Sequence, residues 1–219
     1  MQCPLCHSQT SSSFRHQTRV EVFAQCPQCD LIFVIVEKQL NWQEQKQRYD
    51  QHQNSLNQPG YVQYFEQLLS PLMPELKQRK ISRGLDWGSG PTPALAELLL
   101  QRGVHLDIYD PIYQTDMSDL LAKYDLITCT EVVEHFYAPG DSFAEIFQRL
   151  SSGAFFAGLT QFHQGAEHFA KWWYAKDTTH VAFYSPKTFH WLAQRFGCRI
   201  LYLQSPVFIL EVKAETSIR

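Results

Sequence analysis

Four of the six cysteines lie within the first 29 residues, as two Cys-x2-Cys pairs with 19 residues between them. Two residues between paired cysteines form a tight turn that aims both thiolates at one ion. In a reducing compartment this spacing is typical of structural zinc. Four thiolates complete a tetrahedron and leave no open catalytic position. The sequence therefore predicts a structural Zn2+ ion bound by Cys3, Cys6, Cys26 and Cys29.

A second group of residues that could bind a ligand lies in the stretch GLDWGSGPTP, residues 84–93. Gly88 and Gly90 match the start of the dinucleotide fingerprint G-x-G-x-x-G, but Pro93 stands where the third glycine is required. No Gly-Lys-Ser/Thr follows, which excludes a phosphate-binding P-loop. A nicotinamide-dependent enzyme is therefore disfavoured.

The acidic residues around this turn point to a different ligand. Asp86 precedes Gly88 by two residues, where it repels phosphate and can accept hydrogen bonds from an ammonium group. Asp110 comes 24 residues after Asp86 at the end of the next predicted strand, where a carboxylate can bind both ribose hydroxyls. A ligand with an ammonium group and a ribose but no phosphate indicates S-adenosylmethionine.

The elements that must position these residues alternate between strand and helix. Predicted strands cover 81–87, 105–110, 124–130, 154–160, 199–203 and 207–212. Helices are predicted after the glycine turn, over 140–150 and over 186–196, with Thr92 (before Pro93), Asp141 and Ser185 as N-caps. This alternation predicts an α/β fold with a Rossmann-like, doubly wound, mostly parallel sheet. The last two strands are expected to pair as an antiparallel hairpin at its edge.

Three segments, GLDWGSGPTP, LDIYDP and YDLITCTEVVEHF, resemble in order and spacing the motifs of class I S-adenosylmethionine-dependent methyltransferases. The resemblance covers about residues 80–215, and KDTTHVAFYSPKTFHWLAQRFG also looks like the late segment of this group. It differs at Thr92, where the family commonly has a third glycine. The cofactor-binding residues that the resemblance and the turn together imply are Asp86, Gly88, Ser89, Gly90, Asp110, Thr130 and Glu131. The adenine contact stays open among Asp116, Met117 and Asp119.

The resemblance implies methyl transfer by in-line displacement at a sulfonium, for which the protein mainly orients the nucleophile. His135 follows the third clear strand and His180 lies in the late loop, so we expect both at the mouth of the same crevice. Our hypothesis is that one of them orients or deprotonates the substrate. Trp172, Trp173 and Tyr174 are either packing residues or the wall of a pocket for an apolar substrate.

The chain of 219 residues divides into three predicted parts: a zinc ribbon over 1–36, a helical linker or cap over 37–76 and the cofactor-binding domain over 77–219. Within the ribbon, 13–26 is predicted to form a hairpin arm and 30–36 a strand. The glutamine-rich stretch 37–60 suits a solvated helix, and residues 61–72 suit an amphipathic helix.

Composition and charge limit the classes of partner and function that this chain is expected to have. The formal net charge is −3 and Lys and Arg do not cluster, which disfavours but does not exclude nucleic acid as a partner. Without a signal-peptide pattern or a bilayer-length apolar run, a cytoplasmic location and no membrane partner are expected. The first hypothesis is a methyltransferase acting on an N, O or C nucleophile, with small molecules favoured over RNA. The alternative is a zinc-ribbon accessory protein with an inactive cofactor-binding domain. The methyl acceptor and the oligomeric state stay open.

Overall fold

The computed structural model describes residues 1–35, 43, 46, 59–118, 120 and 123–214. The predicted solvated helix over 37–60 therefore lies almost entirely outside the described residues. Among the described helices, none is both long enough and apolar enough to cross a bilayer. The predicted boundaries after residues 36 and 76 stay predictions.

The larger sheet has six strands in the order β5-β4-β6-β7-β10-β9. Their bounds are β4 Arg83–Trp87, β5 His105–Tyr109, β6 Tyr124–Thr130, β7 Leu150–Leu159, β9 Cys198–Gln204 and β10 Val207–Val212. The four strands β5, β4, β6 and β7 are parallel, whereas β10 runs antiparallel to both β7 and β9. The predicted α/β fold with a mostly parallel sheet and a C-terminal hairpin at the edge is confirmed.

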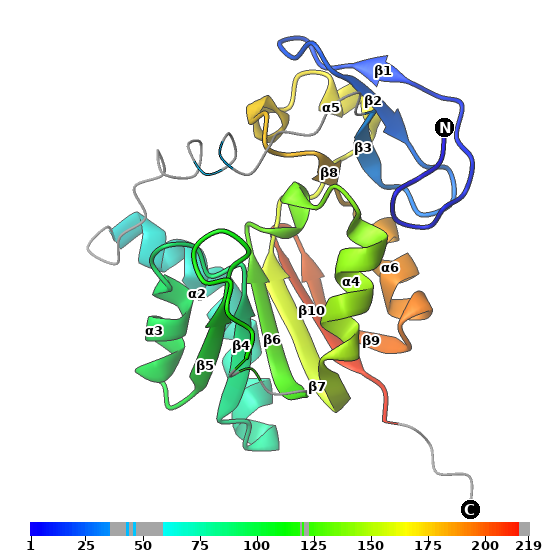
Figure 1. The fold of residues 1–219 in the computed structure, drawn as a ribbon. Helices are drawn as coiled ribbons and strands as arrows, with labels where there is room; N and C mark the ends of the chain where they lie inside the picture. The colour runs from blue at the N-terminus through cyan, green and yellow to red at the C-terminus, as the bar shows by residue number, and fades with distance from the viewer. Residues whose placement is uncertain (36–42, 44–45, 47–58, 119, 121–122, 215–219) are drawn as a thin grey trace, which may run out of the picture.

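Helices cover both faces of this sheet (Figure 1). They are α2 Pro59–Arg79, α3 Ala94–Leu100, α4 Pro139–Gln148 and α6 Pro186–Arg195. The pleat of β7 separates the two layers, because Phe155 belongs to the core beneath α2 and α3 and Phe156 to the core beneath α4 and α6. The predicted amphipathic helix over 61–72 is confirmed within α2, which continues through Pro71 and Pro74.

One predicted helix cap is confirmed and two are wrong. Ser185 caps α6 in a reciprocal capping box with Thr188. Helix α3 begins after Pro93 and has no side-chain cap. The Ala94 N–H donates to the backbone carbonyl of Thr92, and the Thr92 hydroxyl does not cap the helix. Helix α4 begins at Pro139, two residues before Asp141, because proline at the first helical position starts the helix there.

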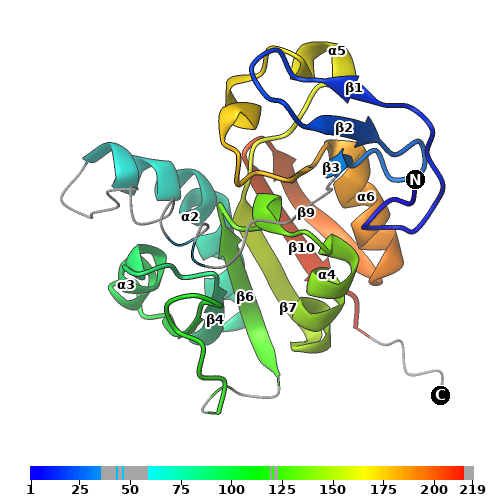
Figure 2. The ribbon, with the colours of Figure 1, turned by 45° about the horizontal axis from the view of Figure 1, so that its top comes forward.

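The N-terminal sheet contains β1 Phe14–Arg15, β2 Val22–Gln25 and β3 Ile32–Ile35, as the predicted hairpin arm and following strand require. Its fourth strand, β8 Ala182–Phe183, comes from near the other end of the chain and pairs with β3. This sheet and the short helix α5 Ala166–Phe169 lie beyond the carboxyl ends of β6 and β7 (Figure 1 and Figure 2). The ribbon therefore lies at the carboxyl end of the large sheet, which is the end where ligands are expected.

Candidate functional site

The glycine turn follows β4 directly and is held by the neighbouring strand. Gly88 and Ser89 donate their backbone N–H groups to the Tyr109 carbonyl at the end of β5, at 2.8 and 3.1 Å. Gly88 has φ +81°, and a Cβ atom there would lie 2.4 Å from Cγ2 of Val132. Only glycine fits this position, because both the backbone conformation and the space exclude a side chain.

Asp86 is buried at the end of β4, with its side chain bonded to the adjacent strand β6. The Thr128 hydroxyl donates to Asp86 Oδ1 at 2.7 Å. Burial raises the pKa of Asp86 to about 6, against the lowering effect of the Thr128 hydrogen bond. A cation on a ligand would favour the ionised form of this carboxyl group.

Asp110 joins the end of β5 to the glycine turn. Its Oδ2 accepts from the Gly90 N–H at 2.9 Å, and its Oδ1 accepts from the N–H groups of Ile112 and Tyr113 at 2.8 and 3.0 Å. The structure thus brings Asp86, the glycines and Asp110 to one end of two adjacent strands. Strand order reverses between β4 and β6, which makes this end a topological switch point.

Of the three candidates for an adenine contact, two lie in the described part of the chain. Asp116 is exposed and accepts a hydrogen bond from the Ser118 N–H at 2.8 Å, and Met117 packs partly buried against the core. Asp119 lies outside the described residues.

Glu131 follows Thr130, the last residue of β6, and has φ +54°, an uncommon conformation for a residue with a side chain. Tyr64 of α2 donates to Glu131 Oε1 at 2.5 Å, and the Tyr174 hydroxyl lies 3.2 Å from Glu131 Oε2. Burial raises the pKa of Glu131. Backbone strain of this kind is concentrated at functional sites.

A second acidic residue lies beside the first, in the 3-10 helix η1 Val133–His135. Glu134 is fully buried, and its Oε1 accepts from the Tyr174 hydroxyl at 2.6 Å. Burial raises the pKa of Glu134, and the Glu131 charge adds to this effect. Glu134 was not singled out from the sequence, because its hydrogen-bond partner Tyr174 lies 40 residues further along the chain.

The structure also brings together the two histidines that were proposed as catalytic. The ring centroids of His135 and His180 are 4.9 Å apart, with an interplanar angle of 71°. Nδ1 of His135 lies 3.0 Å from the Thr179 carbonyl, and Nδ1 of His180 lies 2.8 Å from the Tyr174 carbonyl. Their predicted convergence is therefore observed, while a catalytic role stays a prediction.

The four ribbon cysteines form one cluster, with their sulfur atoms within 4.8 Å of one another. The Sγ distances are 3.6 Å for Cys3–Cys29 and 3.4 Å for Cys6–Cys26, and all four cysteines are free thiols. Sulfurs at about 2.3 Å from a tetrahedral zinc ion would lie about 3.8 Å apart. The cluster therefore fits a zinc ion.

The ribbon contacts the late loop, which comprises residues 175–180, in a way that the sequence did not reveal. The buried Arg19 guanidinium donates to the carbonyls of Ala175, Asp177, Thr178 and His180, at 3.2, 2.9, 3.4 and 2.8 Å. It also pairs with Glu21 at 2.9 Å. The carbonyl partners of Arg19 lie 156 to 161 residues further along the chain, so they follow only from the tertiary fold.

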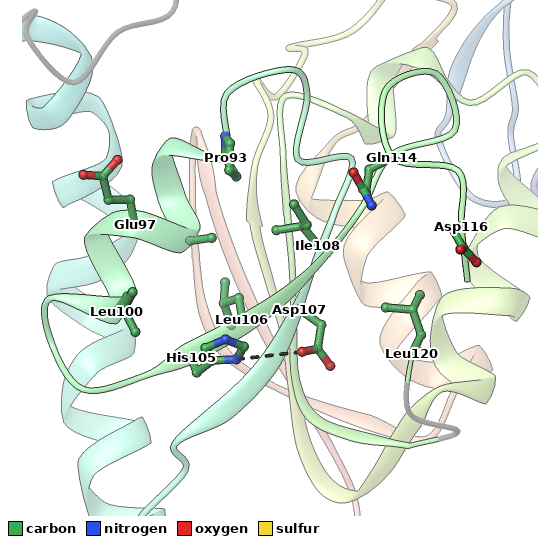
Figure 3. Close-up of a pocket in the computed structure, with 11 residues that line it drawn as sticks. Pro93, Glu97, Leu100, His105, Leu106, Asp107, Ile108, Gln114, Asp116 and Leu120 are labelled. Atoms are coloured by element: carbon green, nitrogen blue, oxygen red, sulfur yellow. Dashed lines mark ion pairs between the residues drawn. The ribbon is translucent and has the colours of Figure 1, made fainter. Parts of the chain in front are cut away.

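A hollow of about 520 Å³ lies near the glycine turn, between α3 and the edge strand β5 (Figure 3). Its lining includes Pro93, Leu106 and Ile108 together with Gln114 and Asp116 of the segment after β5. Among the described residues, Asp86, Gly88 and Asp110 do not line it. The hollow therefore adjoins the segment considered for the adenine contact rather than the glycine turn itself.

Comparison with known proteins supports the fold. The chain resembles a Burkholderia thailandensis 1,6-didemethyltoxoflavin-N1-methyltransferase with bound 1,6-didemethyltoxoflavin and S-adenosylhomocysteine, at a TM-score of 0.54 and 12% identity over 93% of this chain and 100% of that one. A candidate methyltransferase from Bacillus halodurans C-125 gives a TM-score of 0.50 and 15% identity over 62% of this chain and 71% of that one. A search of curated protein sequences found no significant match.

A family model described as a methyltransferase domain matches residues 37–203, which is well over half of the chain. This match includes the glycine turn, Asp110 and the segment with both histidines. The chain therefore belongs to the methyltransferase domain family and contains an S-adenosylmethionine-dependent methyltransferase domain.

Proposed function

We propose that this protein methylates a nitrogen, oxygen or carbon atom of a small-molecule acceptor at the carboxyl edge of β4, β5 and β6. The observation that carries the proposal is the convergence of Asp86, the Gly88–Gly90 turn and Asp110 at the switch in strand order. S-adenosylmethionine supplies a methyl group on a sulfonium with a good leaving group. The residues of the chain then need only bind, orient and shield the reactants.

The proposed cofactor contacts follow from the polarity of each side chain. Asp86 would bind the ammonium group, directly or through water, because it is a buried carboxylate beside the turn. Asp110 would bind the ribose hydroxyls, and the Ser89–Gly90 backbone would approach the ligand closely. Thr130 and Glu131 would lie beside the bound cofactor at the end of β6.

The acceptor would enter beneath the ribbon and the late loop. His135 and His180 would orient it or remove its proton, since His180 packs against Tyr174 and His135 packs against His180. Tyr174 is buried and packs in the core, whereas Trp173 is 63% exposed and lies at the surface. The net charge of −3 favours a small acceptor over RNA.

The ribbon would hold a structural zinc ion through Cys3, Cys6, Cys26 and Cys29. Four sulfur ligands close the coordination sphere, so this ion would stabilise the fold and take no part in methyl transfer.

Calorimetric titration with S-adenosylhomocysteine tests the cofactor assignment. The wild type should bind it, whereas Asp110→Asn should weaken binding by more than about tenfold because a charged acceptor of two hydroxyls is lost. Asp125→Asn is the matched control, because Asp125 is exposed at the other end of the sheet, as the second residue of β6. Tighter binding of NAD than of S-adenosylhomocysteine would refute the proposal.

Two alternative functions make different predictions. An accessory protein would bind S-adenosylhomocysteine but methylate none of the acceptors in a broad screen. An RNA methyltransferase would bind RNA with an affinity that falls steeply with salt. A turnover assay on small nucleophiles, repeated with RNA at two salt concentrations, distinguishes these cases.

A further inference from the structure

Three possible metal ligands converge next to the proposed acceptor site. Glu134, His135 and His180 each offer one ligand atom, and these three atoms lie within 4.8 Å of one another. Two come from η1 and the third comes from the loop before β8, 45 residues further along the chain. The group is separate from the cysteine cluster and contains no sulfur.

An unsatisfied carboxylate oxygen marks this group as more than a packing contact. Among the described residues, Oε2 of Glu134 is buried and makes no hydrogen bond. The other oxygen of this carboxyl group, Oε1, already accepts a hydrogen bond from the Tyr174 hydroxyl. A fully buried carboxylate oxygen without a partner is costly, and a bound cation is one way in which proteins satisfy it.

The histidine hydrogen bonds select the form of the ring that binds metals. A backbone carbonyl can only accept a hydrogen bond, so Nδ1 of each ring carries a proton in its contact with Thr179 or Tyr174. In the neutral imidazole the lone pair is then on Nε2. Metal-binding histidines have this arrangement, with the second nitrogen donating to a carbonyl or carboxylate.

The charge of the surroundings also suits a cation. Glu131 and Glu134 both lie against the Tyr174 hydroxyl, which has one proton for the two carboxyl groups. The described hydrogen bonds and ion pairs bring no Lys or Arg side chain onto either carboxylate. A divalent ion would balance this buried negative charge.

We propose that Glu134, His135 and His180 form a second metal site, which binds a divalent first-row transition ion such as Mn2+, Co2+ or Zn2+. Imidazole nitrogens with one carboxylate are a donor set for such ions. Three protein ligands leave coordination positions open, as in catalytic metal sites. If the proposed function holds, an oxygen of the methyl acceptor would bind at an open position of this ion. This inference rests on the proposed function and favours acceptors with an ionisable hydroxyl.

Cobalt titration of the full chain tests the site without an activity assay. The protein is first loaded with one equivalent of zinc, which the cysteine cluster should take, and Co2+ is then added. We expect one further equivalent to bind, with visible d–d absorption and without the sulfur-to-cobalt charge-transfer band of thiolate ligation. His135→Gln and His180→Gln should each weaken this binding by more than about tenfold. His168→Gln is the matched control, because His168 is exposed outside the cluster.

Glu134→Gln provides a third variant, and thermal unfolding followed by circular dichroism checks that each variant is folded. The proposal is wrong if the wild type binds no second equivalent, if the second ion shows a thiolate band, or if both histidine variants retain wild-type affinity. Parallel titration with S-adenosylhomocysteine separates the two proposals. Cofactor binding without a cobalt site overturns only the metal site, whereas loss of cofactor binding in the wild type overturns the proposed function.

Discussion

The ribbon and the glycine turn both lie at the carboxyl end of the large sheet, but they are held there in different ways. The turn depends on neighbours in sequence and on one adjacent strand, since Gly88 and Ser89 bond only to Tyr109 among the backbone contacts of the described residues. The ribbon depends on a cysteine cluster and on contacts with residues more than 150 positions away, such as Arg19 with His180. Damage to the turn should therefore stay local, whereas damage to the ribbon should reach the late loop.

The largest effect is expected from removing a ribbon thiolate. Cys26→Ser should lose the zinc ion and, with it, most of the order of β1 to β3, because structural zinc supplies roughly 10–16 kcal/mol to small zinc fingers. Zinc analysis and hydrogen exchange over residues 14–35 measure this. Cys198→Ala is the control, since Cys198 lies in the core outside the cluster. Full protection of the ribbon in metal-free protein would contradict the prediction.

Arg19→Lys tests whether the ribbon orders the late loop. Lysine lacks the planar guanidinium that reaches several carbonyls at once. Loss of two hydrogen bonds from a charged group, at about 1.5–3 kcal/mol each, should lower folding stability by about 3–5 kcal/mol. Hydrogen exchange at residues 175–180 should increase, while affinity for S-adenosylhomocysteine should change little. Arg15→Lys is the control, because Arg15 is exposed and, among the described residues, its side chain donates to the Val20 carbonyl alone. Unchanged protection of the loop would show that the two regions are independent.

A pair of alanine variants examines the turn on its own. Gly88→Ala should cost about 2–4 kcal/mol, because a strained backbone conformation is combined with overlap on Val132. Gly90→Ala should cost about 1–2 kcal/mol, since Gly90 has φ +66° but open space around the added Cβ. Denaturant unfolding measures both values, and equal costs would argue against the close packing of the turn. Ribbon protection should not change in either variant.

The smallest effect is expected at Asp86. Its folded pKa of about 6 lies above the ordinary value of 3.8, so the protonated form favours folding and stability falls as the pH rises from about 4 through 6. Asp86→Asn should remove this slope and stabilise the protein by about 1–2 kcal/mol at pH 7.5, because a neutral amide costs less to bury. It should also weaken cofactor binding. Asp125→Asn should keep the slope, and a persistent slope in Asp86→Asn would assign it to another group.

The features predicted from sequence share one property, which is that the residues that define them are close along the chain. The Cys-x2-Cys pairs, the Ser185 cap and the C-terminal hairpin each follow from a few neighbouring residues. Thr92 and Asp141 were wrong as caps because two prolines offered alternative starts, and the choice depended on backbone contacts at each turn.

The features missed by sequence all join distant segments. Strand β8 is two residues long and is stabilised by pairing with β3, so its own residues carry little strand signal. Arg19 and Glu134 have partners from other segments, and their burial follows only from the complete fold. His135 and His180 were predicted to converge because the resemblance located both segments at one crevice.

The pairing of β3 with β8 has a consequence for synthesis on the ribosome. The N-terminal sheet is made first, but its last strand is about 150 residues downstream, which corresponds to roughly 7–30 s of translation. During that interval the edge of β3 has no native partner, and exposed strand edges invite pairing with other chains. Early capture of zinc by the cysteines would keep the nascent ribbon compact until its final strand emerges.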